Sequence, residues 1–253
     1  MSSKIIVIGA GVIGAASALS LQADGHQVTL LDREAPCAGA SFGNAGAIVN
    51  GSCVPTAMPG IIFDVMRMAV QPLSPLSIRA EYFHKIFPWL LRFIWQSRSV
   101  AVSKNATHLR ALTKHAVDSW HQLVDDTALA PLVEEAGWLK VYEKEASFAD
   151  TAKARKLMDE AGTSYEVLGR REISDLEPNL APIFNFGFYQ KDCLRLVNPH
   201  KLVNSMVDLM VSRGGQFKQF DVERIQHEGK QVSLSGSAGS ITADKVIVAA
   251  GAW

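Results

Sequence analysis

The sequence predicts an α/β fold, and three observations support this prediction. A β-branched run at residues 5–8 is followed at once by a glycine-rich turn and by helix-forming residues up to Gly25. A second strand, expected at residues 27–31, then completes a βαβ unit. The uninterrupted run at residues 5–8 is typical of a parallel strand that is buried on both faces. Between residues 221 and 249, short alternating runs separated by Glu228-Gly229 and Ser235-Gly236 predict a β-meander.

The composition is that of an ordinary globular protein and excludes some partners. Of 253 residues, 48% are apolar and 20% are charged, which is ample material for a core. Lys plus Arg and Asp plus Glu both total 25, so the chain has no net charge that would attract nucleic acid. The three cysteines, Cys37, Cys53 and Cys193, are too widely spaced for a metal site and odd in number. We therefore expect a cytoplasmic chain that binds no nucleic acid and no metal.

The uncharged stretch at residues 5–21 needs a separate interpretation, because it could suggest a signal peptide or a membrane span. It contains three glycines and two serines, and no cleavage region follows it. A spanning helix needs about 20 predominantly apolar residues. We therefore expect this stretch to belong to the folded domain.

The glycine-rich turn has the spacing of a dinucleotide fingerprint, and it stands between a strand and a helix. In such a fingerprint Gly9 permits the tight turn, Gly11 lets the backbone approach a pyrophosphate, and Gly14 allows close packing of helix on strand. The helix N-terminus presents N–H groups and a partial positive charge to the phosphates. The candidate binding residues here are Gly9, Ala10, Gly11, Val12, Ile13 and Gly14.

Asp32 ends the second strand, at the place where an acidic residue accepts hydrogen bonds from the hydroxyl groups of a ribose. An acid here would repel a 2′-phosphate, which argues against NADP. Asp32 and the adjacent Arg33 therefore join the candidate residues. The fingerprint by itself does not choose between NAD and FAD.

A loop of small residues follows the βαβ unit at residues 35–51, where a nicotinamide-binding domain would continue its β-α alternation. Its core, GASFGNAG at residues 39–46, resembles the second flavin loop of the D-amino-acid oxidase-like FAD oxidoreductases, most closely in the form found in bacterial D-amino-acid dehydrogenases. The resemblance implies FAD as the cofactor. The residues that it adds as flavin contacts are Ser41, Asn44, Ala45 and Gly46.

The resemblance continues near the other end of the chain. A helix with Pro199 near its start is expected through about Arg213, and the meander follows. Val222 resembles the residue whose backbone meets the adenine in this family, and Ala250-Gly251 resembles its closing turn near the dinucleotide. The implied fold is a Rossmann-like FAD-binding domain with a β-meander, formed by residues 1–51 and 196–253. Residues 52–195 are expected to form part of an α+β substrate domain with helical segments.

Two interpretations remain open for the aromatic segment at residues 84–97. It is too short to span a membrane and contains Pro88. It could lie on a membrane surface with Trp89 and Trp95 at headgroup depth, or it could pack in the core of the substrate domain. We favour the core, because aromatic stripes most often serve packing.

The resemblance also implies a reaction. Members of this family oxidise the CH–NH bond of amino acids or secondary amines by hydride transfer to flavin, and those of the dehydrogenase type pass electrons to the respiratory chain. We therefore expect an enzyme that acts on amino acids, D-amino acids above all, with at most peripheral contact with the inner face of the membrane. The family's carboxylate-binding arginine comes from a C-terminal half that has no counterpart here, so we expect a C-terminally truncated chain.

No motif selects a catalytic residue from the candidates Arg79, Tyr82, Arg92, Arg110, Tyr142 and Arg195. Three alternatives stay open beside the leading hypothesis. The chain could be a non-catalytic fragment that retains at most dinucleotide binding. It could also be an amine oxidase like sarcosine or glycine oxidase, or an NAD-linked dehydrogenase.

Overall fold

The computed structural model describes residues 2–63, 65, 79–125 and 127–252. The chain divides into two compact units. Unit 1 contains Met1–Ile48, Asp118–Ala136 and Leu194–Trp253, and unit 2 contains Val49–Val117 and Gly137–Cys193. Residues 118–136, which we assigned from the sequence to the substrate domain, therefore group with unit 1.

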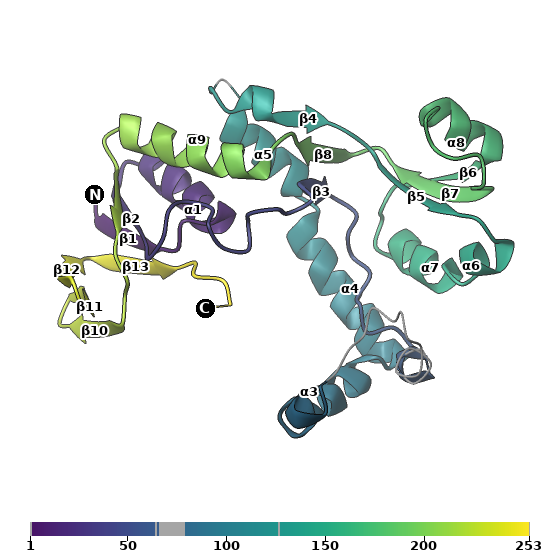
Figure 1. The fold of residues 1–253 in the computed structure, drawn as a ribbon, viewed down its shortest axis with the longest axis horizontal. Helices are drawn as coiled ribbons and strands as arrows, with labels where there is room; N and C mark the ends of the chain where they lie inside the picture. Colours follow the sequence, from purple (N-terminus) through teal and green to yellow (C-terminus); the bar gives the residue numbers. More distant parts are fainter. Residues whose placement is uncertain (1, 64, 66–78, 126, 253) are drawn as a thin grey trace. The chain divides into compact units, whose positions relative to one another are not determined.

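Unit 1 is built on a four-stranded parallel sheet with the order β13-β1-β2-β9 (Figure 1). Its central strand β1 contains Ile5, Ile6 and Val7, which are all buried, as expected for a strand covered on both faces. The sequence predicted three of the four strands, and the fourth, β9, was missed. The strands are β1 (Lys4–Ile8), β2 (Gln27–Asp32), β9 (Gln216–Gln219) and β13 (Lys245–Val248).

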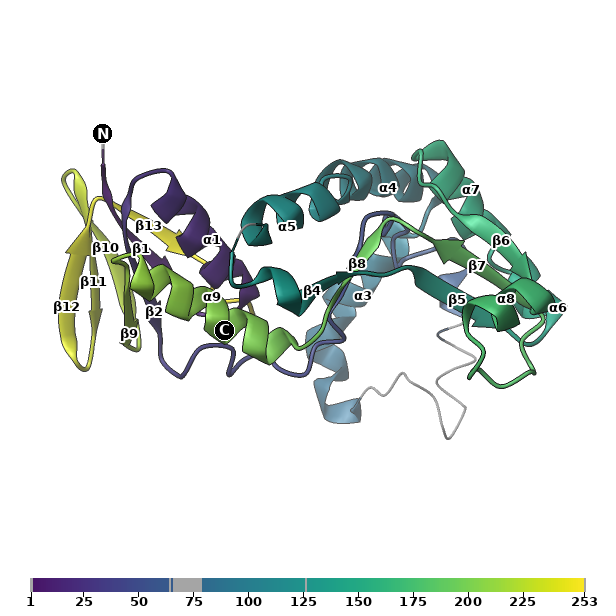
Figure 2. The same cartoon turned by 90° about the horizontal axis from the view of Figure 1, so that it is seen from above.

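Two helices of unit 1, α1 (Val12–Ala23) and α9 (Pro199–Ser212), pack against each other beside this sheet (Figure 2). Asn198 caps α9, because its side-chain oxygen accepts a hydrogen bond from the backbone N–H of Lys201 at 2.9 Å. The side-chain amide of Gln22 joins the ends of the two helices by donating to the carbonyl oxygens of Met210 and Arg213, both at 3.0 Å.

The predicted meander is present as three antiparallel strands, β10 (Arg224–Glu228), β11 (Gln231–Gly236) and β12 (Gly239–Ala243). Its apolar side packs on the parallel sheet, where Val232 and Leu234 share a buried cluster with Ile6 and Leu31. Its first strand begins at Arg224, three residues later than predicted. The segment that precedes it, residues 220–223, is therefore not part of a strand.

A second sheet has the order β3-β8-β4, and these strands are short. We expected residues 35–51 to form a loop, and this expectation was wrong at residues 47–49, where the short strand β3 lies. Their bounds are β3 (Ala47–Val49), β4 (Val133–Glu135) and β8 (Cys193–Leu196). The 3-10 helix η2 (Ala130–Leu132) leads into β4.

Unit 2 contains an antiparallel sheet with the order β5-β7-β6. Cys53, Met158 and Phe188 form a buried cluster beside it, against which Tyr142 and Phe148 pack. Between β5 and β6 the chain forms two helices, which separate at residues 150–151. The elements are β5 (Trp138–Tyr142), β6 (Glu166–Gly169), β7 (Phe186–Gln190), α6 (Glu145–Ala149), α7 (Ala152–Glu160) and α8 (Arg170–Leu176).

Two further helices, α4 (Ser99–Thr113) and α5 (Ala116–Val124), follow each other closely along the chain. Before them come η1 (Ala80–Tyr82) and the aromatic helix α3 (Phe83–Gln96). We expected residues 84–97 to pack in a core, and this expectation was wrong, since no residue of α3 is buried. Among the described residues, none of the helices has the length and apolar character needed to cross a membrane.

Candidate nucleotide-binding site

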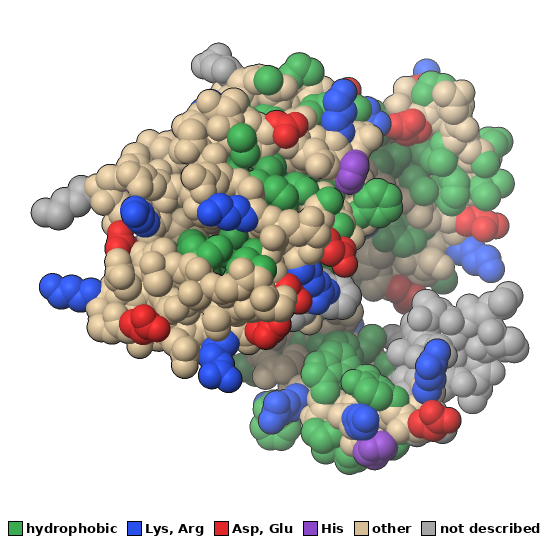
Figure 3. Space-filling view, turned by 60° about the vertical axis from the view of Figure 1, so that its left-hand side comes forward, with side chains coloured by type: hydrophobic (Ala, Val, Ile, Leu, Met, Phe, Trp, Pro, Cys, Tyr) green, Lys and Arg blue, Asp and Glu red, His purple; other side chains and the backbone are tan. Residues whose placement is uncertain are grey.

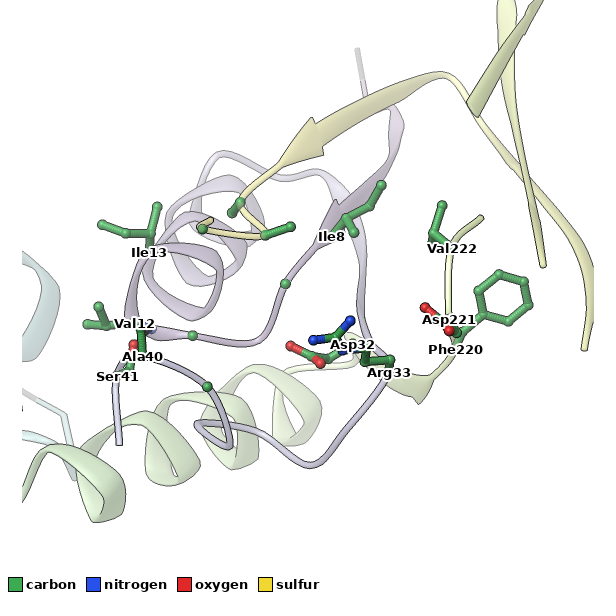
Figure 4. Close-up of a pocket in the computed structure, with 16 residues that line it drawn as sticks. Ile8, Val12, Ile13, Asp32, Arg33, Ala40, Ser41, Phe220, Asp221 and Val222 are labelled. Atoms are coloured by element: carbon green, nitrogen blue, oxygen red, sulfur yellow. Dashed lines mark hydrogen bonds between the residues drawn. The ribbon is translucent and has the colours of Figure 1, made fainter. Parts of the chain in front are cut away.

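A cleft of about 320 Å³ opens in unit 1 beyond the carboxyl ends of β1, β2 and β13 (Figure 4). Ligands of open parallel sheets bind at this edge, and the volume lies in the lower range of ligand pockets. The lining residues come from the glycine turn, the end of β2, the second loop, the segment before β10 and the turn after β13. They are Ile8, Gly9, Gly11, Val12, Ile13, Asp32, Arg33, Gly39, Ala40, Ser41, Phe220, Asp221, Val222, Ala249, Ala250 and Gly251.

The glycine turn is so tightly packed that two of its positions have no room for a side chain. Gly9 has a φ of +105°, and a Cβ there would overlap the carbonyl oxygen of Ala249. A Cβ on Gly14 would overlap the carbonyl oxygen of Gly9. At Gly11 a Cβ would lie 3.1 Å from Oγ of Ser41. The turn therefore brings the start of α1 close to β1 with bare backbone facing the cleft.

Asp32 holds this turn in place as well as lining the cleft. Its Oδ2 accepts a hydrogen bond from the backbone N–H of Ala10 at 2.7 Å, and its Oδ1 accepts one from Glu34 at 3.0 Å. Each carboxylate oxygen can accept from a second donor. The side chain can therefore organise the turn and still receive hydrogen bonds from a ligand. The sequence predicted that Asp32 receives hydrogen bonds from a ligand, but it did not predict that Asp32 organises the turn.

Ser41 connects the second loop to the start of α1. Its Oγ accepts a hydrogen bond from the backbone N–H of Val12 at 3.0 Å, which satisfies one of the donors that a helix leaves free at its N-terminus. Ile13, on the same turn of α1, lines the cleft with a side chain that is 67% exposed. The hydroxyl and the apolar side chain thus stand at the mouth of the cleft beside the helix N-terminus.

The part of the second loop that follows Ser41 lies outside the cleft lining. Asn44 turns back on its own loop, where its Oδ1 accepts a hydrogen bond from the N–H of Gly46 at 2.9 Å. The carbonyl oxygen of Gly46 in turn accepts from the N–H of Leu196 at 2.7 Å, and Ala45 is exposed. The structure therefore does not bring these three residues to the cleft.

Ten of the fifteen residues predicted from the sequence line the cleft, namely Gly9, Gly11, Val12, Ile13, Asp32, Arg33, Ser41, Val222, Ala250 and Gly251. Ala10 and Gly14 are buried beneath the turn. The sequence reasoning did not include Phe220 and Asp221, which precede Val222 in the segment that joins the sheet to the meander. Because both residues directly precede Val222 in the sequence, the prediction for Val222 could have been extended to them.

Phe220 anchors that segment, because its N–H donates to the carbonyl oxygen of Asp32 at 2.7 Å and its side chain is buried in the cluster beneath the meander. Gly236 lies behind the segment, and a Cβ there would overlap the carbonyl oxygen of Asp221. Figure 4 shows Asp221 and Val222 across the cleft from Val12 and Ser41. The meander and β2 therefore position one wall of the cleft.

Cys37 lies on the loop below the turn, where its N–H donates to the carbonyl oxygen of Ala10 at 2.9 Å. It is the one non-glycine residue with positive φ, +64°, in the part of the chain that the structure describes. Burial raises the pKa of its thiol, which keeps the thiol protonated near neutral pH. Cys37 thus has a packing role in supporting the turn.

Two of the cations that we considered for substrate binding contact groups of the protein itself. Arg195 pairs with Glu134. Arg110 donates to the backbone carbonyl and Oδ1 of Asn50, at 3.0 and 2.8 Å, and to the carbonyl oxygen of Ala161 at 3.2 Å. Over the residues that the structure describes, no group of three or more His, Cys, Asp or Glu is placed to hold a metal ion. We assign no catalytic residue.

Comparison with known proteins agrees with a flavoprotein fold. A D-amino-acid oxidase of Bradyrhizobium diazoefficiens is 31% identical over 252 residues, which are 98% of this chain and 60% of that protein. A D-amino acid dehydrogenase of Vibrio vulnificus is 28% identical over 256 residues, 99% of this chain and 61% of that protein. The chain thus spans about 60% of the length of these curated relatives.

Solved structures match at lower identity, which shows likeness of fold alone. A glycine oxidase from Geobacillus kaustophilus superposes with a TM-score of 0.63 at 18% identity, covering 100% of this chain and 56% of that one. An L-alpha-glycerophosphate oxidase from Mycoplasma pneumoniae, solved with FAD bound, gives 0.59 at 13% identity, covering 97% and 53%. A family model described as FAD dependent oxidoreductase matches residues 4–253. Because that model covers nearly the whole chain, the protein belongs to the family of FAD-dependent oxidoreductases.

Proposed function

We propose that unit 1 binds FAD in its cleft and that the protein oxidises amino acids, D-amino acids in particular. The observation that carries the proposal is the cleft itself. It lies at the carboxyl edge of a parallel sheet and combines a glycine turn, an acidic residue at the end of β2 and a segment that leads into a meander. The names of the sequence relatives support the choice of D-amino acids.

The residues around the cleft fit the dinucleotide part of FAD. Bare backbone at Gly9 and Gly11 leaves room for a pyrophosphate next to the N-terminus of α1, where N–H groups and the helix dipole favour anions. Asp32 is suited to accept hydrogen bonds from a ribose, since it lines the cleft and its carboxylate oxygens have lone pairs left. The backbone of Val222 is suited to the adenine.

The bound flavin would supply a hydride acceptor for the carbon that carries the amino group of the substrate. The residues of this chain would hold the cofactor and orient it, and the cleft would exclude water from the dinucleotide. An amino acid also needs a cation for its carboxylate. Arg110 and Arg195 are already engaged with protein groups.

That engagement favours a second candidate function, in which this chain binds FAD without turning over substrate. For the whole protein we propose a respiratory electron acceptor, as in a dehydrogenase, with oxygen as the alternative acceptor of an oxidase. We further propose a cytoplasmic location with peripheral contact with the membrane.

We expect anaerobic addition of D-alanine to the FAD-loaded protein to bleach the flavin absorbance, because hydride transfer reduces the flavin. L-Alanine serves as the matched control and should leave the spectrum unchanged. Reoxidation by a soluble quinone faster than by oxygen would support the dehydrogenase. Bound flavin that neither enantiomer reduces would contradict turnover by this chain and support the binding function alone. Bleaching by L-alanine alone would contradict the proposed substrate class.

A further inference from the structure

The helix α3 exposes a continuous row of large apolar side chains. Phe83, Phe87, Leu91, Ile94 and Trp95 are 48, 45, 53, 37 and 61% exposed. Their spacing of four, four, three and one residues places them along one side of the helix, within about 120° of rotation. Figure 3 shows hydrophobic side chains at the surface of the lowest part of the molecule, where Figure 1 places α3. Soluble proteins rarely leave a continuous apolar row of this kind uncovered.

The remaining sides of α3 have different characters. Ile86, Leu90 and Phe93 are half-buried and lie together on another side of the helix. Lys85 and Arg92 are exposed and lie within about 20° of the position opposite Phe83, given 100° of rotation per residue. The helix therefore has a half-buried apolar side, an exposed apolar side and a basic side.

The charge around α3 differs from that of the chain as a whole. The chain has no net charge, but the stretch from Arg79 to Arg98 holds four Lys or Arg residues against one acid, Glu81. The guanidinium of Arg98 lies 3.5 Å from the ring centre of Trp95, and its Nε donates to the carbonyl oxygen of Trp95 at 3.0 Å. A cation is thus fixed at the end of the exposed apolar row.

We propose that α3 binds the surface of an anionic lipid bilayer. Apolar and aromatic side chains would enter the boundary between headgroups and acyl chains, and the basic residues would contact the lipid phosphates. Charge complementarity selects this occupant, because a protein partner would not require an excess of cations beside the apolar row. The four basic residues and the row of Phe, Leu, Ile and Trp together form the docking surface.

This surface goes beyond the cofactor cleft and is independent of it, since α3 belongs to unit 2 and the cleft to unit 1. Its connection with function does rest on the proposed function, because a membrane-bound electron acceptor would be met at the bilayer. Failure of FAD binding would leave lipid binding unchanged. Failure of lipid binding would leave FAD binding unchanged.

The test is co-sedimentation of the full chain with vesicles of phosphatidylglycerol and phosphatidylcholine, compared with vesicles of phosphatidylcholine alone. We expect binding to the anionic vesicles that weakens as salt is added. The double variant Phe87→Ser/Leu91→Ser should bind at least ~10-fold more weakly, because it removes apolar area from the interface. The double variant Arg92→Glu/Arg98→Glu should bind the anionic vesicles at least ~25-fold more weakly, which corresponds to about fivefold for each cation removed.

The matched control is Val100→Ser/Leu112→Ser, which removes two apolar side chains of the neighbouring helix α4 that are 85 and 78% exposed. It should bind vesicles like the unmodified protein. Circular dichroism and an FAD titration of each variant check that the fold is kept. Equal vesicle binding by all variants would overturn the proposal, as would a lack of binding to anionic vesicles. Self-association that depends on Phe87 and Leu91, without vesicle binding, would identify the row as a protein interface and would also overturn it.

Discussion

Replacing Gly14 by alanine is expected to abolish FAD binding and to lower the free energy of unfolding by about 3 kcal/mol. The added Cβ would overlap the carbonyl oxygen of Gly9, which is backbone and cannot turn aside as a side chain could. The start of α1 must then move away from β1, and the glycine turn moves with it. Urea unfolding followed by circular dichroism measures the stability, and quenching of FAD fluorescence measures the binding.

The matched control for this change is Gly169→Ala in unit 2. Gly169 has a φ of −88°, which any residue adopts, and a Cβ there would meet only Oε2 of Glu172 at an ordinary 3.6 Å. We expect its stability to change by less than about 1 kcal/mol, with FAD affinity unaltered. A Gly14→Ala protein that binds FAD as tightly as this control would show that close packing of the turn is not required for the site.

Replacing Asp32 by alanine is expected to weaken FAD binding by about 100-fold, and this is the second large effect. The change removes the acceptor for the N–H groups of Ala10 and Glu34 as well as the proposed acceptor for the ribose. Hydrogen bonds to a charged group contribute about 1.5–3 kcal/mol each, so the loss of two bonds to the ribose hydroxyls corresponds to at least that factor. Asp32→Asn keeps one side-chain oxygen and should lie between the two. Isothermal titration with FAD measures the series.

Glu34→Ala is the control for charge, because Glu34 is an exposed acid two residues away that does not line the cleft. It should bind FAD with unchanged affinity. If Asp32→Ala and Glu34→Ala reduced the affinity equally, general electrostatics would explain the loss and the specific role of Asp32 would be wrong.

The sequence predicted the parts of the fold whose residues carry a strong local pattern. The β-branched runs of β1 and β13, the strand pattern of β2 and the start of α9 at Pro199 are of this kind. Strand β9 was missed, because QFKQ contains a single apolar residue and its strand conformation depends on pairing with β2. The core prediction for α3 failed for a related reason. An apolar stripe predicts an amphipathic helix, but it does not say what covers the stripe.

The candidate site likewise combines features that a local sequence pattern predicts with features that depend on tertiary contacts. The spacing of Gly9, Gly11 and Gly14 is visible in the sequence, since the fingerprint is local. The bond from Ala10 to Asp32 and the bond from Val12 to Ser41 join segments that are distant along the chain. Such contacts form only when the fold brings β2 and the second loop to the turn. No pattern in either segment predicts them. The prediction for Asn44 placed it at the cofactor, while the structure turns it back on its own loop.

The most direct test of this account is titration of the purified chain with FAD and, separately, with NAD⁺. We predict one FAD bound for each chain, with quenched flavin fluorescence, and no displacement of the flavin by excess NAD⁺. The cleft of unit 1, with Asp32 beside the glycine turn and Val222 on the opposite wall, is the basis of this prediction. A chain that binds NAD⁺ in preference to FAD, or that binds neither dinucleotide, would contradict the account.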